Sequence, residues 1–260
     1  MNDDSPHRIS EPTGYDARRG AGISVVMPAY NEASGIASVV RGFLAHPDVA
    51  EVIVADNGST DGTRELAAAA GARVVQETSR GYGFASRCAL MAASRPWVVI
   101  TESDNTFDPE DVTKFVAYHR QFDVVFGTRT SKSLIWSGAN MGWFLRYGNW
   151  AVAKYLEYLH NGPCLTDVGC TYRMLRREVI HDLAQFWRVG DSSFSPELMV
   201  LAIRRGWRCV EIPVNYGTRT GVSKITGSKV RAFKLGLRMI WLILRLRFRR
   251  IPRLPRTLPD

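Results

Sequence analysis

The chain has 260 residues, of which 45% are apolar and 23% charged, a balance that excludes a wholly disordered chain and a fibre. The net charge of +9 is unevenly placed, because residues 224–256 hold 11 Lys and Arg and no acidic residue. The other residues carry 23 basic against 25 acidic side chains, so the body of the protein is near neutral. This distribution argues against a uniformly basic nucleic-acid binder, and we expect no nucleic-acid partner.

The cysteines and the N-terminal residues indicate a reduced, cytoplasmic setting. The four cysteines form no CxxC pair, and no histidine stands at zinc-ligand spacing from them. Residues 1–22 are polar and lack the apolar core of a signal peptide, and we expect them to form a disordered tail. No uncharged apolar run approaches the ~20 residues needed to cross a bilayer.

From residue 23 onward, short apolar runs alternate with helical patterns, which predicts βαβ units and a mainly parallel sheet in an α/β fold. The predicted strands are 23–27, 51–55, 73–76, 97–101, 123–127 and 208–213. The predicted helices are 34–44, 61–70, 82–93, 109–118 and 195–205. An aromatic-rich stretch within 130–165 is expected to form a helix that packs on the sheet.

Polar clusters follow four of the predicted strands, at the sheet edge where parallel sheets bind their ligands. The clusters are residues 28–32, 56–62, 102–105 and 127–129. Each one alone is compatible with a turn or a helix cap. Four of them at one edge of a sheet favour a binding site.

Two acidic residues, Glu102 and Asp104, follow a predicted buried strand. Carboxylates this close repel each other unless a cation lies between them. Mg²⁺ and Mn²⁺ suit such a pair, because they bind one or two carboxylates together with substrate phosphates. With Asp56 after another strand, the pair predicts a nucleotide-diphosphate site; the alternative is a capping acid beside a solvated turn acid.

A glycine-containing segment, residues 80–85, opens one predicted helix. A dinucleotide fingerprint needs a third glycine and follows the first strand, so the segment excludes a Rossmann dehydrogenase. Its glycines are compatible with backbone N–H groups close to a phosphate or sugar, and equally with a tight turn.

The order of these motifs resembles family 2 glycosyltransferases, and most closely the polyprenyl-phosphate glycosyl transferases of the dolichyl-phosphate mannose synthase type. The resemblance covers about residues 23–227 and extends to Thr166-Asp167, Arg173, Glu197 and the Gly-x-Ser-Lys run at 221–224. It implies a GT-A fold, in which helices flank a Rossmann-like, mainly parallel sheet. It also implies a UDP- or GDP-linked sugar donor, Mg²⁺ or Mn²⁺ as cofactor, and a polyprenyl-phosphate acceptor.

Carried over position by position, the resemblance implies a role for each of ten residues. The residues implied to hold the nucleoside are Pro28, Tyr30, Glu32 and Asp56. Those implied to bind the metal and the diphosphate are Glu102 and Asp104, the latter also catalytic. Those implied to meet the acceptor phosphate, and also catalytic, are Arg129 and Arg173. Those implied to lie on a loop that closes over the site are Ser223 and Lys224.

Four departures from the family pattern bear on the site. Glu102 stands where Asp is usual, and Thr106 stands where a glutamine is common. Residues 170–173 replace the usual Ser-Gly-Phe-Arg, and Arg219 lies one residue nearer the Gly-x-Ser-Lys run than expected. These departures leave a catalytically inactive binding module of the same fold as an alternative.

The C-terminal residues 228–260 are expected to form a basic amphipathic tail. A helix over 228–250 would place Phe233, Leu237 and Trp241 on one face and Arg238 and Arg245 on a neighbouring one. Such a helix suits a membrane interface, and the alternative is packing on the enzyme body or on a partner protein. Because no spanning segment accompanies it, a small membrane protein partner is a further expectation.

The sequence therefore predicts inverting transfer of one hexose or N-acetylhexosamine from a nucleotide sugar to a polyprenyl phosphate. The expected location is peripheral, on the cytoplasmic face of the membrane. The alternative hypothesis for an enzyme is a soluble glycosyltransferase that acts on a small molecule or a glycan. The residues name neither the sugar nor the nucleotide.

Overall fold

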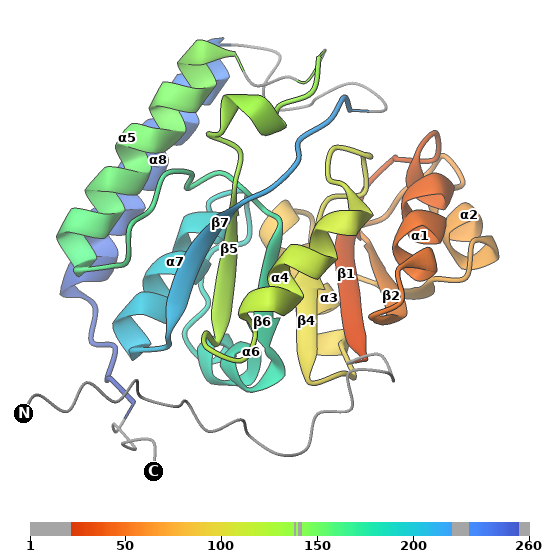
Figure 1. Ribbon diagram of the computed structural model, residues 1–260, viewed down its shortest axis with the longest axis horizontal. Helices are drawn as coiled ribbons and strands as arrows, with labels where there is room; N and C mark the ends of the chain where they lie inside the picture. The colour runs from red at the N-terminus through yellow and green to blue at the C-terminus, as the bar shows by residue number, and fades with distance from the viewer. Residues whose placement is uncertain (1–21, 138, 140–141, 220–228, 255–260) are drawn as a thin grey trace, which may run out of the picture.

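The computed structural model describes residues 22–137, 139, 142–219 and 229–254, which fold into a sheet with helices on both faces (Figure 1). The strands are β1 (Ile23–Ala29), β2 (Val49–Asp56), β3 (Arg73–Gln76), β4 (Trp97–Ile100), β5 (Val124–Thr128), β6 (Arg173–Arg176) and β7 (Cys209–Pro213). The α-helices are α1 (Ile36–Ala45), α2 (Thr63–Ala69), α3 (Tyr82–Ala92), α4 (Val112–Tyr118), α5 (Trp143–His160), α6 (Arg177–Ala184), α7 (Phe194–Arg205) and α8 (Lys229–Phe248). Two short 3₁₀ turns are η1 (Pro109–Asp111) and η2 (Lys132–Leu134). The predicted tail 1–22 lies, except for Gly22, outside the described residues.

Within the described residues, seven strands form one sheet in the order β3-β2-β1-β4-β6-β5-β7. All neighbours pair in parallel except β6, which runs antiparallel to β4 and to β5. The strand order reverses at β1, because β2 and β3 lie on one side of it and β4 on the other. The carboxyl ends of β1, β2 and β4 therefore frame a crevice of the kind that binds ligands. The mainly parallel α/β fold predicted from the sequence is confirmed.

Strand β6 is the strand that the sequence pattern does not reveal. All four of its residues pair with β4, where Ile100 lies opposite Arg173. Three of them also pair with β5, where Phe126 lies opposite Arg173. A strand this short shows no alternation, and it directly follows a polar loop. Its pairing is instead set by the two buried strands between which it lies.

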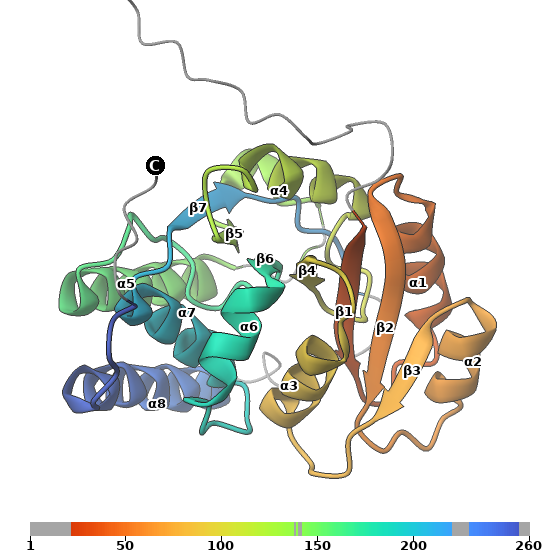
Figure 2. The same cartoon turned by 90° about the horizontal axis from the view of Figure 1, so that it is seen from below.

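Both faces of the sheet are buried, as apolar runs in parallel strands require. Side chains of β1 alternate between the two cores: Val25 and Met27 pack with α1 and α4, whereas Val26 packs with α3 and α7. Helices α5 and α8 lie side by side beyond α7, as both views show (Figures 1 and 2). The pair is joined by a hydrogen bond of 3.0 Å between His160 Nε2 and the carbonyl oxygen of Ile243.

Helix α8 presents two different apolar stripes. Met239, Ile243 and Leu246 are buried in the core shared with α5 and α7, so α8 packs on the body of the protein. The second stripe is exposed and consists of Phe233, Leu237, Ile240, Trp241, Leu244 and Phe248. Of the described helices, none combines the length and the apolar character needed to cross a membrane.

Candidate active site

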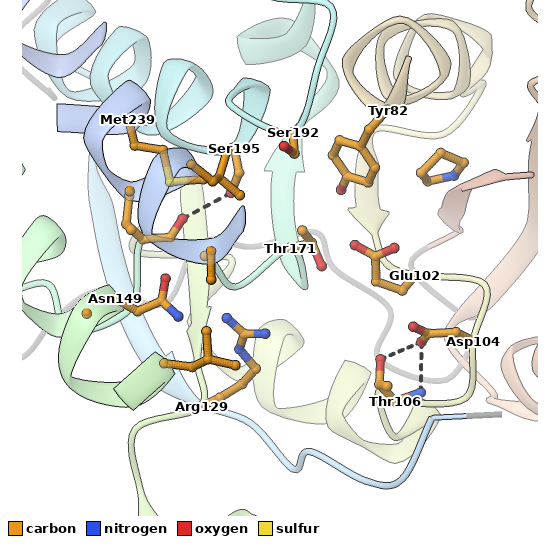
Figure 3. A pocket seen from close by; sticks show the side chains of 18 of the residues that line it. Tyr82, Glu102, Asp104, Thr106, Arg129, Asn149, Thr171, Ser192, Ser195 and Met239 are labelled. Carbon is orange, nitrogen blue, oxygen red and sulfur yellow. Dashed lines mark hydrogen bonds between the residues drawn. The ribbon is translucent and has the colours of Figure 1, made fainter. Parts of the chain in front are cut away.

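A cavity of about 770 Å³ opens at the carboxyl ends of the parallel strands. Side chains that follow β1, β4 and β5 line it, together with residues of α3, α5 and α8. Figure 3 shows the acidic pair facing Arg129 and Asn149 across this space. The cavity brings together six of the predicted site residues: Pro28, Tyr30, Glu32, Glu102, Asp104 and Arg129.

The loop after β1 is held by the loop after β2. Asn31 has a left-handed backbone with φ 55°, a conformation that asparagine tolerates better than most residues. Its backbone N–H donates to Ser59 Oγ at 3.0 Å, and its side-chain oxygen accepts from the Thr60 N–H at 2.9 Å. The next N–H, that of Glu32, donates to Thr63 Oγ1 at 2.9 Å. Two of the predicted clusters are therefore one unit that presents Tyr30 and Glu32 to the cavity.

Asp56, predicted to hold the nucleoside, is buried behind the cavity wall. Its carboxylate is completely buried and accepts from Arg64 Nη2 at 2.8 Å and from the Ser59 N–H at 3.1 Å. The cavity wall at this strand is formed by the next residue, Asn57. Asp56 thus braces the Ser59 loop from behind through an ion pair that the motif does not show, and its contact with a nucleoside stays a prediction.

Asn57 and Arg80 shape the end of the cavity next to Tyr30. Asn57 Oδ1 accepts from the Gly81 N–H at 2.9 Å, and its Nδ2 donates to the Ser79 carbonyl at 2.8 Å. The guanidinium of Arg80 lies 4.4 Å from the centroid of the Tyr30 ring. A cationic group stacked on an aromatic ring makes a flat, polarisable wall for a base.

The glycines at the start of α3 allow a neighbouring loop to approach. The Gly83 N–H donates to the Gly190 carbonyl oxygen at 2.8 Å, and a Cβ at Gly83 would lie 2.7 Å from the Gly190 carbonyl carbon. The Gly83 N–H is therefore engaged by the protein backbone rather than by a phosphate. Close backbone approach is the reason for glycine at this position.

The acidic pair is built by the turn after β4. Asp104 is almost fully buried, and its Oδ1 accepts from the Thr106 N–H at 3.1 Å and from Thr106 Oγ1 at 2.5 Å. The intervening Asn105 has φ 63°, which closes the turn on Asp104. Thr106, one of the departures from the family pattern, thus orients the Asp104 carboxylate.

The environment of Glu102 indicates an unbalanced negative charge. Burial and the charge of Asp104 raise the pKa of Glu102 to about 7, although hydrogen bonds from Thr171 and Tyr82 act in the opposite direction. Two neighbouring carboxylates in a partly dry site favour a bound cation. Glu102 and Asp104 are therefore suited to neutralisation by a positive group.

Arg219 supplies such a positive group. Its Nη1 lies 3.0 Å from Asp104 Oδ2, and its Nη2 lies 2.8 Å from Glu32 Oε1. Across the described residues, no cluster of three or more His, Cys, Asp or Glu side chains could enclose a metal. Two carboxylates without further protein ligands fit Mg²⁺ or Mn²⁺, which take their remaining ligands from water and substrate phosphates.

Arg129 lies on the opposite side of the cavity and is held by Asp167. Its Nε and Nη2 donate to the two Asp167 oxygens at 2.8 and 3.0 Å. Asp167 is fully buried, and its N–H donates to Glu211 Oε1 at 3.1 Å. Burial raises the pKa of Glu211 to about 7, against the hydrogen bonds from Thr166 and Asp167 that lower it. This chain of contacts fixes the orientation of the guanidinium through a bidentate, charge-assisted pair.

Arg173, also predicted to meet the acceptor phosphate, is buried behind the cavity wall. Its Nε donates to the Cys170 carbonyl at 2.9 Å, and its Nη1 donates to the Ser195 carbonyl at 2.7 Å. Its guanidinium carbon lies 5.3 Å from the ring centroid of Phe126. Arg173 therefore ties the loop before β6 to α7, and it supports the wall that Val168 and Ser195 form. The other two predicted residues, Ser223 and Lys224, lie outside the described residues.

Asn149 is a site residue that the sequence analysis misses. It lies on α5 beside Arg129 (Figure 3). A Cβ at Gly169 would lie 2.5 Å from Asn149 Oδ1 and 3.1 Å from Arg129 Nη2, so Gly169 leaves room for both side chains. A polar residue inside an aromatic-rich helix is the one sequence signal that points to it.

The fold and the site together define a class: a GT-A enzyme with an acidic pair, a stacked Tyr30–Arg80 wall and an arginine held by Asp167 around one cavity. The chain belongs to glycosyl transferase family 2, whose sequence model matches residues 24–184. The resemblance that the motifs predict is thereby confirmed, and the protein is a family 2 glycosyltransferase.

Individual relatives agree with this assignment. The chain is 34% identical over 204 residues to the dolichyl-phosphate hexose transferase of Haloferax volcanii, a match that covers 78% of this chain and 86% of that protein. It is 36% identical over 211 residues to an uncharacterized glycosyltransferase of Mycobacterium tuberculosis, covering 80% and 92% of the two chains.

A solved structure shares the fold. It is glucosyl-3-phosphoglycerate synthase from Mycobacterium tuberculosis in complex with Mn²⁺, uridine-diphosphate and phosphoglyceric acid. This chain matches it with a TM-score of 0.67 and 25% identity, over 89% of this chain and 79% of that chain.

Proposed function

We propose that this enzyme transfers a single hexose or N-acetylhexosamine from a nucleotide-diphosphate sugar to a polyprenyl phosphate, with inversion, at the cytoplasmic face of a membrane. The observation that carries the proposal is one cavity that joins the Glu102–Asp104 pair to Arg129 and reaches the exposed apolar stripe of α8. The name of the Haloferax volcanii relative supports a lipid-phosphate acceptor.

The donor is assigned to the end of the cavity nearest β1 and β2. Tyr30, Arg80 and Asn57 would hold the nucleoside of a UDP- or GDP-linked sugar. Glu102 and Asp104 would hold Mg²⁺ or Mn²⁺, which supplies Lewis-acid stabilisation of the departing nucleoside diphosphate. The Mn²⁺ and uridine-diphosphate in the fold relative support this donor chemistry.

The acceptor is assigned to Arg129. A phosphate monoester has a second pKa near ~6 and is largely dianionic at neutral pH, so it attacks without a general base. Arg129, held by Asp167, would orient the phosphate through charge-assisted hydrogen bonds. Placement and charge then account for the rate, and a single displacement inverts the anomeric carbon.

An acceptor panel tests this function. The purified enzyme, UDP- and GDP-linked hexoses and N-acetylhexosamines, and Mn²⁺ or Mg²⁺ are combined with either a short polyprenyl phosphate or 3-phosphoglycerate. We expect one sugar on the polyprenyl phosphate, detected by mass, and loss of product with excess chelator. Product on 3-phosphoglycerate alone would instead support a soluble glycosyltransferase, the alternative that the fold relative favours. Neither transfer nor donor hydrolysis would indicate an inactive binding module.

Membrane attachment is assigned to an aromatic surface on α5 and α8. On α5, Trp143, Tyr147 and Trp150 are exposed on one face, and on α8 the side chains of Trp241 and Phe248 are 59% and 80% exposed. Helix α8 has six Lys and Arg and no acidic residue. Aromatic and basic side chains on an interfacial helix suit an anionic leaflet. A small membrane protein on the same surface is the competing arrangement.

Charged substitutions on this surface test the attachment. In Trp241→Glu/Phe248→Glu we expect at least about tenfold weaker binding to vesicles with phosphatidylglycerol, because apolar burial and charge attraction are both reduced. Cosedimentation at two salt concentrations measures it. The matched control is Leu66→Glu/Met91→Glu, which alters exposed apolar residues of α2 and α3 and should bind like the wild type. Equal pelleting of both double variants would exclude this surface as the anchor.

A further inference from the structure

The cavity continues past Arg129 as an apolar groove between α5 and α8. Figure 3 shows Met239 and Asn149 on the side away from the acidic pair. The α5 residues that line the groove are Phe144, Leu145, Gly148 and Val152. Those on α8 are Ala232, Phe233, Leu235, Gly236, Leu237, Met239 and Ile240. The polar half of the cavity suits a sugar nucleotide, whereas this half excludes one, because nearly all its side chains are apolar.

The two ends of the groove differ in chemistry. The inner end has Arg129 and Asn149, which lie close together over Gly169. At the outer end, Phe233, Leu237 and Ile240 line the groove and are also exposed. The groove therefore leads from an anion-binding arginine to the aromatic surface. A ligand with an anionic head and a long apolar chain matches both ends at once.

Two helical glycines border the groove, one on each helix. A Cβ at Gly148 or at Gly236 would meet no atom of the described residues within 4 Å, apart from its own helix backbone. This distinguishes them from Gly83 and Gly169, where a neighbouring atom requires glycine. A helix is less stable with glycine at an interior position than with alanine there. At these two positions no close packing contact compensates for the helix stability that glycine costs. What glycine preserves there is the open space of the groove.

We propose that the groove holds the first isoprene units of the acceptor, and that Gly148 and Gly236 set the bulk of chain it admits. This inference rests on the proposed function, since it takes polyprenyl phosphate as the acceptor. Each isoprene unit carries a methyl branch, so the chain is wider than a straight alkyl chain. Side chains at the two glycines would narrow the groove where this branched chain passes.

The test compares two prenyl phosphates that differ in chain length. Binding of farnesyl phosphate and of dimethylallyl phosphate is measured by calorimetry with wild type, Gly148→Leu, Gly236→Leu and the double variant, and transfer is measured separately. We expect the double variant to bind farnesyl phosphate about tenfold more weakly, because burial of several chain carbons is lost. Dimethylallyl phosphate, held mainly by its phosphate, should bind within about twofold of wild type. Donor binding should be unchanged.

The matched control is Gly142→Leu, the same substitution at an exposed glycine before α5 where a Cβ also meets open space. It should bind both phosphates like the wild type. Undiminished farnesyl phosphate binding in the folded double variant would overturn the groove assignment. Binding of both prenyl phosphates weakened to the same extent would also overturn the groove assignment, because binding would then not depend on the length of the prenyl chain. Wild type that binds farnesyl phosphate without transferring sugar would refute the proposed function and leave the groove standing.

Discussion

Asp104→Asn is expected to lower the rate of sugar transfer by at least about 10³-fold while the protein stays folded. Asparagine keeps the shape of the side chain and an oxygen that accepts from the Thr106 N–H, a bond of 3.1 Å in the wild type. It removes the negative charge that, with Glu102, would hold the divalent cation. Cation stabilisation of a leaving group contributes several kcal/mol to a transition state, and each ~1.4 kcal/mol is a factor of ten in rate.

The measurement is kcat at saturating donor over a Mn²⁺ titration, with a melting curve for each variant. The control is Asp108→Asn, the same chemical change four residues further on, where the carboxylate caps η1 by accepting from the Glu110 N–H at 3.1 Å. We expect that variant to turn over normally. Wild-type turnover by Asp104→Asn, or full activity in excess chelator, would contradict the assignment of the acidic pair.

Position along the strands was the most predictable feature of the site. The polar residues that follow β1 and the Glu102-x-Asp104 pair that follows β4 lie at the same edge of the sheet. The reason is that the carboxyl ends of parallel strands meet at one edge. Tyr30 and Glu32 follow from the same rule. No knowledge of side-chain contacts is needed for that step.

Burial of polar side chains by ion pairs and hydrogen bonds was the feature that the sequence could not supply. Asp56 and Arg173 belong to the same motif order as the cavity residues, yet Arg64 covers the first and the Ser195 and Cys170 carbonyls hold the second. A motif gives the position of a residue on the chain, and not the direction its side chain takes. Residues distant in sequence decide whether such a side chain lines the cavity or packs behind its wall.

Helix α8 illustrates a second limit. Its 3.6-residue period indicates one apolar stripe, and the residues of that stripe are exposed. The stripe of Met239, Ile243 and Leu246 that packs on α7 has a similar spacing and lies next to it on the helix. In a helix that is apolar around much of its circumference, either of two stripes can be the buried one. Contact with α5 and α7 decides which stripe is buried, and it also creates the groove.

Arg129→Lys is expected to lower kcat/KM for the acceptor by about 10²-fold and to leave the KM for the donor nearly unchanged. The Arg129 guanidinium holds Asp167 with Nε and Nη2, and as a planar group it has a further edge that a phosphate can engage. Lysine has a single ammonium on a flexible chain, so it cannot keep the bidentate pair and orient a phosphate together. Loss of one or two charge-assisted hydrogen bonds is worth about 1.5–3 kcal/mol each.

Initial rates over separate acceptor and donor titrations, with melting temperatures, measure this effect. Arg208→Lys is the matched control, because Arg208 makes the same fork with Asp123, at 3.1 and 3.2 Å, outside the cavity. A merely structural role for Arg129 would reduce stability and affect both substrates alike, as any loosening of the fold does. A selective loss for the acceptor assigns the guanidinium to the phosphate. A donor KM that rises as much as the acceptor KM would instead move Arg129 to the donor side of the reaction.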